Sequence, residues 1–127
     1  MKKILVIDDE APVRKVITRY LEHDGFAVTS VGTFEDAIAA VREQFFNLVI
    51  TDIILPGKNG IELIADLDKE VPGLKYIAIS GGGQIPAELY LESARNQGAS
   101  ITLMKPFDRT ELLSAVHELI GEPALTT

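Results

Sequence analysis

The sequence contains no cysteine, no apolar run of membrane-spanning length and few basic residues. Without cysteine the chain has neither disulfides nor thiol chemistry. Its first apolar run, Ile4–Ile7, is ended by two aspartates. That run is far shorter than the ~20 residues needed to cross a bilayer, and it is too short for a signal peptide. We therefore expect a soluble, cytoplasmic protein with no membrane insertion.

The shortage of basic residues narrows the classes of partner. Lysine and arginine number 12 against 19 aspartates and glutamates, which sets the formal net charge at -7. Non-specific binding to nucleic acid needs a basic surface, so no direct nucleic-acid binding is expected. The two histidines, His23 and His117, form no metal-binding pattern with cysteine, and we predict that both lie on solvated helix faces.

The chain does have a regular alternation of aliphatic runs and amphipathic segments. Aliphatic runs without polar alternation suit strands buried on both faces of a parallel sheet. They occur at residues 3–8, 26–31, 48–51, 76–80 and 101–104. Apolar residues at helical spacing, with capping or helix-ending residues around them, predict helices at about 13–21, 33–43, 61–67, 86–97 and 108–120, and residues 56–60 are predicted to be a loop.

Five strand–helix units indicate the fold class. Short connections and right-handed crossovers produce a parallel sheet with helices on both faces. An eight-unit barrel would need about twice this length, so we expect an open, doubly wound α/β fold. We expect one domain over residues 1–121 and a short flexible tail over residues 122–127.

Polar residues that can carry chemistry stand where the predicted strands end. They are Asp8 and Asp9 after the first strand, Asp52 after the third, Ser80 after the fourth and Lys105 after the fifth. The carboxyl ends of parallel strands meet at one edge, where doubly wound folds keep their working site. Close carboxylates repel one another, and Mg²⁺, which prefers oxygen ligands, relieves that repulsion. One carboxylate could then act as a nucleophile and form an acyl phosphate.

Four segments together resemble the receiver domain of two-component response regulators. They are Val6-Ile-Asp-Asp-Glu10, Thr51-Asp-Ile-Ile-Leu-Pro-Gly57, Ser80 after an apolar strand, and Lys105-Pro106-Phe107. Their order and their places at the strand ends make the match specific, and it covers roughly residues 2–120. The resemblance implies a flavodoxin-like fold with strand order 2-1-3-4-5.

The resemblance also implies a magnesium site and a phosphorylated residue. Asp52 would accept the phosphoryl group. Asp9 and Asp52 would bind Mg²⁺ directly, Asp8 would act through water, and Ile54 would contribute its backbone carbonyl. The donor would be a sensor histidine kinase or a histidine phosphotransfer protein, whereas the downstream target is not implied. Such a domain is regulatory and not an enzyme, although it assists its own phosphotransfer and dephosphorylation.

Further roles follow from the same resemblance. Lys105, joined to Pro106 by a cis bond, would contact the phosphoryl group, and Ser80 would move toward it on activation. Many members have an aromatic residue where this chain has Thr102, so we expect activation to change mainly residues 81–91. Ile54 and Gly82 occupy positions that influence dephosphorylation, and neither has a polar side chain. We therefore expect the phosphorylated form to be long-lived.

Other functions remain open at this point. The main alternative is a Mg²⁺-dependent phosphohydrolase with an aspartyl-phosphate intermediate, but the expected D-x-D pattern is absent from Asp8-Asp-Glu-Ala-Pro12. A flavin-binding flavodoxin would need a first loop rich in Ser, Thr and Gly, whereas the acidic residues here would repel a flavin phosphate. Taken singly, the aspartates could be helix-capping acids and Lys105 could be a surface lysine.

Overall fold

The computed structural model describes residues 1–52, 54–55, 58–81 and 100–122. Its main feature is a five-stranded sheet in the order β2-β1-β3-β6-β7, with every neighbouring pair parallel. The strands are β1 (Lys3–Ile7), β2 (Ala27–Val31), β3 (Leu48–Asp52), β6 (Lys75–Gly81) and β7 (Ser100–Lys105). Counted along the chain within this sheet, the order is 2-1-3-4-5, which confirms the expected doubly wound, flavodoxin-like topology.

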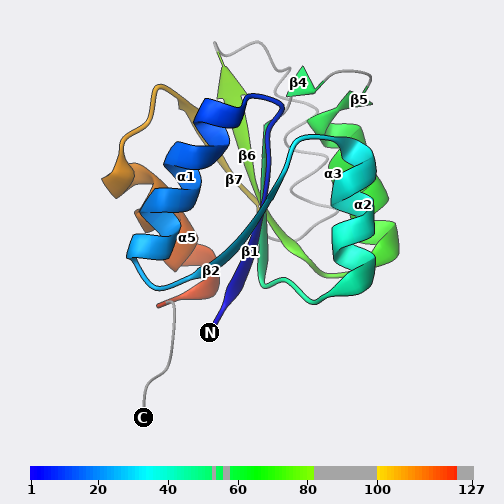
Figure 1. Ribbon diagram of the computed structural model, residues 1–127, viewed down its shortest axis with the longest axis horizontal. Helices are drawn as coiled ribbons and strands as arrows, with labels where there is room; N and C mark the ends of the chain where they lie inside the picture. The colour runs from blue at the N-terminus through cyan, green and yellow to red at the C-terminus, as the bar shows by residue number, and fades with distance from the viewer. Residues whose placement is uncertain (53, 56–57, 82–99, 123–127) are drawn as a thin grey trace.

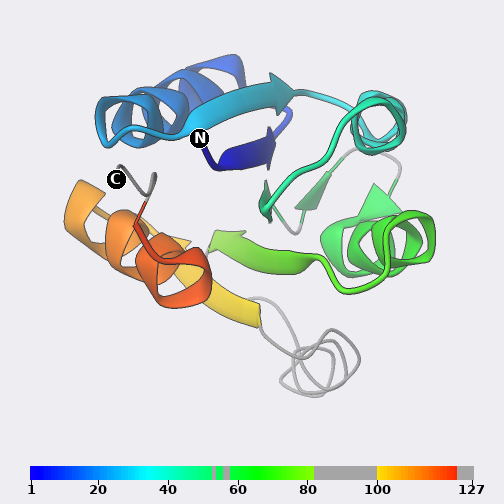
Figure 2. The ribbon, with the colours of Figure 1, turned by 90° about the horizontal axis from the view of Figure 1, so that it is seen from below.

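Helices cover both faces of the sheet (Figures 1 and 2). One face carries α1 (Ala11–His23) and α5 (Arg109–Ile120), and the other carries α2 (Phe34–Glu43) and α3 (Gly60–Glu70). The helix expected at 86–97 lies outside the described residues, as do most of segment 81–91 and the tail beyond residue 122. Among the described residues, no helix is both long enough and apolar enough to span a membrane.

Local sequence signals explain where the helices begin. Thr33 accepts a 3.1 Å hydrogen bond from the amide of Asp36 and caps α2. Asp108 and Glu111 each accept a hydrogen bond from the other's amide, which forms a capping box at the start of α5. The C-terminal end of α1 has a signal as well: Gly25, just after the helix, has a φ of 107°, a left-handed conformation that glycine adopts without strain.

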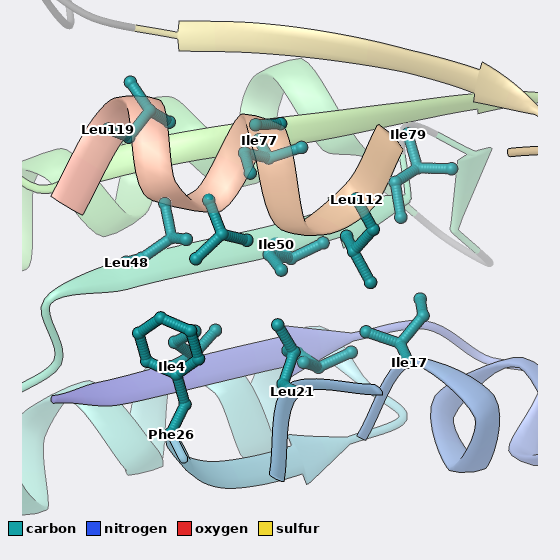
Figure 3. Close-up of a cluster of buried hydrophobic side chains, with 13 residues drawn as sticks. Ile4, Ile17, Leu21, Phe26, Leu48, Ile50, Ile77, Ile79, Leu112 and Leu119 are labelled. Atoms are coloured by element: carbon teal, nitrogen blue, oxygen red, sulfur yellow. The ribbon is translucent and has the colours of Figure 1, made fainter. Parts of the chain in front are cut away.

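Two hydrophobic layers hold the helices to the sheet. The layer beneath α1 and α5 is drawn in Figure 3, and its labelled members are Ile4, Ile17, Leu21, Phe26, Leu48, Ile50, Ile77, Ile79, Leu112 and Leu119. The opposite layer joins α2 and α3 to the sheet through Leu5, Ile7, Ala37, Val41, Val49, Leu63, Leu67 and Tyr76. Strands buried on both faces need apolar side chains in both directions, which is why the aliphatic runs show no polar alternation.

The last turn of α5 is also held at the amino edge of the sheet. The ammonium group of Lys2, just before β1, donates to the carbonyl of Ile120. Lys75 at the start of β6 donates a 2.7 Å hydrogen bond to the carbonyl of Leu119. Cations suit this position because the last carbonyls of a helix lack partners within the helix and form the negative end of its dipole.

Two expectations differ from the structure. Residues 58–59, expected in a loop, form β5 (Lys58–Asn59), which pairs in an antiparallel manner with β4 (Ile54–Leu55). Strands of two residues are too short to leave a periodic pattern in the sequence. His117, expected on a solvated face, is half-buried and makes a 2.8 Å contact with Asp24, because α5 packs against the end of α1.

Candidate functional site

The carboxyl edge of the sheet brings Asp8 and Asp52 together. In the register of β1 and β3, Ile7 lies opposite Thr51, so the residues that follow them are neighbours as well. Both carboxylates are buried: Asp8 is 1% exposed and Asp52 is 6% exposed. Two neighbouring buried acids need a compensating positive charge, because burial removes the water that would solvate them.

Lys105 supplies part of that charge. Its ammonium group lies 2.9 Å from Asp52 Oδ2 and 3.8 Å from Asp8 Oδ2. It also lies 4.0 Å from Glu10 Oε1. The bond between Lys105 and Pro106 is cis, as expected. Lys105 therefore neutralises Asp52 through a direct contact, and Asp8 and Glu10 at longer range.

The pKa values of these groups reflect their proximity. Burial raises the pKa of Asp8 to about 6, and the negative charge of Asp52 adds to that effect. A 2.8 Å hydrogen bond from the amide of Glu10 and the charge of Lys105 act in the opposite direction. Burial lowers the pKa of Lys105, but its hydrogen bond with Asp52 and the charges of the three acids outweigh this, so that its pKa is raised overall.

A group of carboxylate oxygens next to Lys105 and Asp52 fits a divalent cation. Carboxylate oxygens of Asp8, Asp9 and Glu10 all lie within 4.8 Å of one another. Asp8 Oδ2 is buried and has no hydrogen-bond partner in the described part of the chain. A hard cation such as Mg²⁺ takes oxygen ligands and would contact that atom more closely than Lys105 does at 3.8 Å. The donor set therefore fits the expected metal.

The structure brings some of the predicted site residues together, whereas the side chains of others lie outside its described part. Asp8, Asp52 and Lys105 come together, and Asp9 joins them through the oxygen group. Asp52 does not belong to the group of oxygens within 4.8 Å, although its charge acts on Asp8. Ser80 lies near the end of β6, but its side chain is outside the described part of the structure, as is that of Ile54.

Sequence reasoning gave no role to two residues that contact this edge. One is Glu10, an exposed acid that lies close to Asp8, Asp9 and Lys105. Its position directly after two aspartates was the available signal. The other is Arg14, whose guanidinium Nη1 donates a 2.5 Å hydrogen bond to the backbone carbonyl of Asp8. No sequence pattern signals that contact, because it depends on how α1 lies against the turn before it.

A doubly wound sheet whose edge gathers buried aspartates around a lysine is the arrangement expected of a phospho-accepting regulatory domain. The sequence model of the family described as "Response regulator receiver domain" matches residues 4–117. The chain belongs to this family. Receiver domains are regulatory domains that bind Mg²⁺ at an acidic pocket and act as phosphorylation-activated switches, and nothing supports the phosphohydrolase alternative over this assignment.

Curated relatives extend well beyond the length of this chain. The DNA-binding response regulator MtrA of Mycolicibacterium paratuberculosis is 37% identical over 118 residues, which are 91% of this chain and 50% of that protein. The transcriptional regulatory protein ResD of Bacillus subtilis is 29% identical over 125 residues, 98% of this chain and 50% of that protein. The chain thus spans about half the length of these relatives.

Solved structures match nearly the whole chain. A CheY-like response regulator receiver domain protein from Methanospirillum hungatei JF-1 has a TM-score of 0.82 and 32% identity, covering 93% of this chain and 92% of that one. The receiver domain of NtrX from Brucella abortus also has a TM-score of 0.82, with 29% identity over 92% of this chain and 97% of that one. The fold is therefore shared over more than nine-tenths of each chain.

Proposed function

We propose that Asp52 is the residue through which this receiver domain is switched by phosphorylation. The observation that carries the proposal is the contact between Lys105 and Asp52, in which a carboxylate at the end of a buried strand lies 2.9 Å from an ammonium group. A carboxylate oxygen that attacks phosphorus forms an acyl phosphate. Lys105 can then transfer its hydrogen bond to a phosphoryl oxygen without leaving the edge.

Mg²⁺ is the ion that we propose for the acidic pocket. Its ligands would be oxygen atoms of Asp9, Asp52 and the Ile54 backbone carbonyl, with Asp8 acting through water. The ion, when bound, neutralises charge that develops on the transferring phosphoryl group. Support comes from Asp8 Oδ2, which is buried without a hydrogen-bond partner in the described residues, and from Glu10, which adds a further oxygen to the same group.

Ser80 is the residue that we assign to sensing the phosphoryl group. It belongs to β6, which lies between the strand that carries Asp52 and the strand that carries Lys105. A hydroxyl at the carboxyl end of that strand can donate to a phosphoryl oxygen on its neighbour. Movement of Ser80 toward Asp52 after phosphorylation would alter the domain surface that partners recognise.

A sensor histidine kinase or a histidine phosphotransfer protein is the proposed phosphodonor. The bond between phosphorus and the imidazole nitrogen breaks as the bond to the Asp52 oxygen forms. We propose that the domain assists this transfer and later its own dephosphorylation, in which water accepts the phosphoryl group. The named relatives are transcriptional and DNA-binding regulators. For this domain we propose protein partners in the cytoplasm and no direct contact with nucleic acid, because its net charge is -7.

Phosphorylation by acetyl phosphate tests the assignment of Asp52. With Mg²⁺ present, mass spectrometry of the wild-type chain should show one added phosphoryl group, and Asp52→Asn should remain unlabelled. Asp36→Asn, which changes an exposed aspartate on α2, is the matched control and should be labelled normally. Undiminished labelling of Asp52→Asn would overturn the assignment, whereas continuous turnover of acetyl phosphate without a stable label would favour a hydrolase.

A further inference from the structure

The turn that follows β1 is fastened by contacts to its backbone. The amide of Asp8 donates a 3.2 Å hydrogen bond to the carbonyl of Val31 at the end of β2. The amide of Glu10 donates to Asp8 Oδ1 at 2.8 Å. Arg14, one turn into α1, donates through Nη1 to the carbonyl of Asp8 at 2.5 Å. The peptide groups on both sides of Asp8 are therefore held from β2 and from α1.

Gly32 leaves the space in which the Arg14 guanidinium lies. A Cβ atom built on Gly32 would lie 2.9 Å from Arg14 Nη1 and 3.5 Å from Cζ. The φ of Gly32 is not positive, so its backbone does not require glycine. What favours glycine here is the close approach of the guanidinium. Any larger residue must push aside the group that donates to Asp8.

The charge of Arg14 and its hydrogen bond have opposite consequences for a metal site. A fixed positive charge beside the acidic turn repels a divalent cation and would weaken its binding. A fixed hydrogen bond to the turn orders the carboxylates and would strengthen binding, because fewer conformations are lost when the ion arrives. The guanidinium can hold the peptide through this bond while its charge remains partly exposed to solvent, which screens the repulsion.

We propose that Arg14 and Gly32 together form a positioning device for the acidic pocket. Arg14 touches neither the metal nor the phosphoryl group, and it acts through the Asp8 peptide by fixing the directions of the Asp8 and Asp9 carboxylates. Gly32 takes part because it has no side chain to displace the guanidinium from that carbonyl. This inference rests on the proposed magnesium site and names two residues that set its affinity.

The sign of the change in magnesium affinity distinguishes positioning from charge. Calorimetric titration of the full chain with MgCl₂ should show that Arg14→Ala weakens binding by about tenfold, the usual effect of losing a partner that orients a metal ligand. Lys15→Ala removes an exposed positive charge from the next position of the same helix and should leave affinity unchanged or slightly tighter. Arg14→Lys should recover part of the loss, since an ammonium group can still donate.

Gly32→Ala tests the same device from the other element. It should weaken binding less than Arg14→Ala, because the guanidinium is the far end of a flexible side chain and can shift. In a chain that already carries Arg14→Ala, the added Gly32→Ala should change nothing. Equal or tighter binding by Arg14→Ala, or an undiminished effect of Gly32→Ala in the absence of the arginine, would overturn the proposal.

A readout without metal separates this inference from the proposed magnesium site. Amide hydrogen exchange of the metal-free chain should show that the Glu10 amide, which is bonded to Asp8 Oδ1, exchanges faster in Arg14→Ala and Gly32→Ala than in Lys15→Ala. Exchange in the core strands, compared in the same samples, reports whether each variant is folded. If the wild-type chain bound no magnesium, the metal assignment would fail, and the exchange of Glu10 would still decide the positioning role, with unchanged exchange overturning it.

Discussion

Lys105, at the end of β7, hydrogen-bonds Asp52, at the end of β3, over 2.9 Å. The two strands are not neighbours, because β6 lies between them. The bond therefore crosses the carboxyl edge over the end of β6. Lys105 compensates the charge of the Asp52 carboxylate, which is almost completely buried. The same ammonium group is already in place to neutralise the charge that a phosphoryl group would add.

Removing this lysine should destabilise the metal-free protein. Lys105→Ala leaves Asp52 and Asp8 buried without their nearest cation, and we expect a loss of about 2 kcal/mol in the free energy of unfolding. The loss should shrink when Mg²⁺ is added, because the ion takes over the neutralisation. Urea unfolding with and without Mg²⁺ measures both effects. Lys69→Ala, at an exposed position on α3, is the control and should change neither value.

Asp8 should make the protein less stable as the pH rises between about 4 and 6. Its pKa is raised from 3.8 to about 6 in the folded state, so across this interval the folded chain holds a proton that the unfolded chain has lost. Folding stability therefore falls as the pH rises through that window, by up to about 3 kcal/mol from this group. Asp8→Asn keeps an oxygen acceptor for the Glu10 amide and removes the titration.

The comparison of stability curves isolates that contribution. Without metal, Asp8→Asn should be more stable than the wild-type chain at pH 7, and the difference should disappear near pH 4. Urea unfolding at several pH values provides the measurement. A difference that stays constant from pH 4 to pH 7 would show that the wild-type Asp8 is not held in its protonated form by the fold.

Magnesium should raise the melting temperature through Asp9. Binding to the folded state alone adds about 1.4 kcal/mol when free Mg²⁺ is roughly tenfold above its dissociation constant. For a domain of this size that corresponds to roughly 5 °C. Asp9→Asn should lose most of the increase, whereas the exposed Asp36→Asn should keep it. Equal increases in all three proteins would remove Asp9 from the set of ligands.

Ile54 should set the lifetime of the phosphorylated form. Neither Ile54 nor the residue at 82 has a side-chain acid or amide that could orient a water molecule toward the acyl phosphate. Replacing Ile54 with asparagine should therefore accelerate loss of the phosphoryl group, measured as the decay of the phosphorylated mass after removal of acetyl phosphate. Leu55→Asn, which adds the same amide one position away, is the control. An unchanged or slower decay in Ile54→Asn would contradict the explanation.

The large elements of the fold were predictable because each carries a local pattern. Aliphatic runs located the five strands to within a residue or two, and capping residues such as Thr33 and Asp108 located helix starts. Once the strands are parallel, their polar ends must share an edge. The meeting of Asp8, Asp52 and Lys105 therefore followed from topology, whereas the proposed roles depended on a resemblance to a family.

What the sequence did not predict depends on contacts between distant elements. The pairing of Arg14 with the Asp8 carbonyl needs the path of α1 and the absence of a side chain at Gly32. The contact of His117 with Asp24 needs α5 to pack against α1, and periodicity alone assigned that histidine to solvent. Such contacts leave no spacing signal, because the partners are far apart in sequence or bond through the backbone.

The two lysines that hold the end of α5 have a consequence for communication across the sheet. Lys2 precedes β1, whose other end leads to Asp8, and Lys75 begins β6, whose other end carries Ser80. A shift of either strand along its own axis changes the distance that its lysine must span to the last carbonyls of α5. Hydrogen bonds thus join the end of α5 to the amino ends of the two strands that lead to the proposed site. A displacement at the carboxyl edge can pass along the covalent backbone of either strand to the amino edge, and from there to the helix.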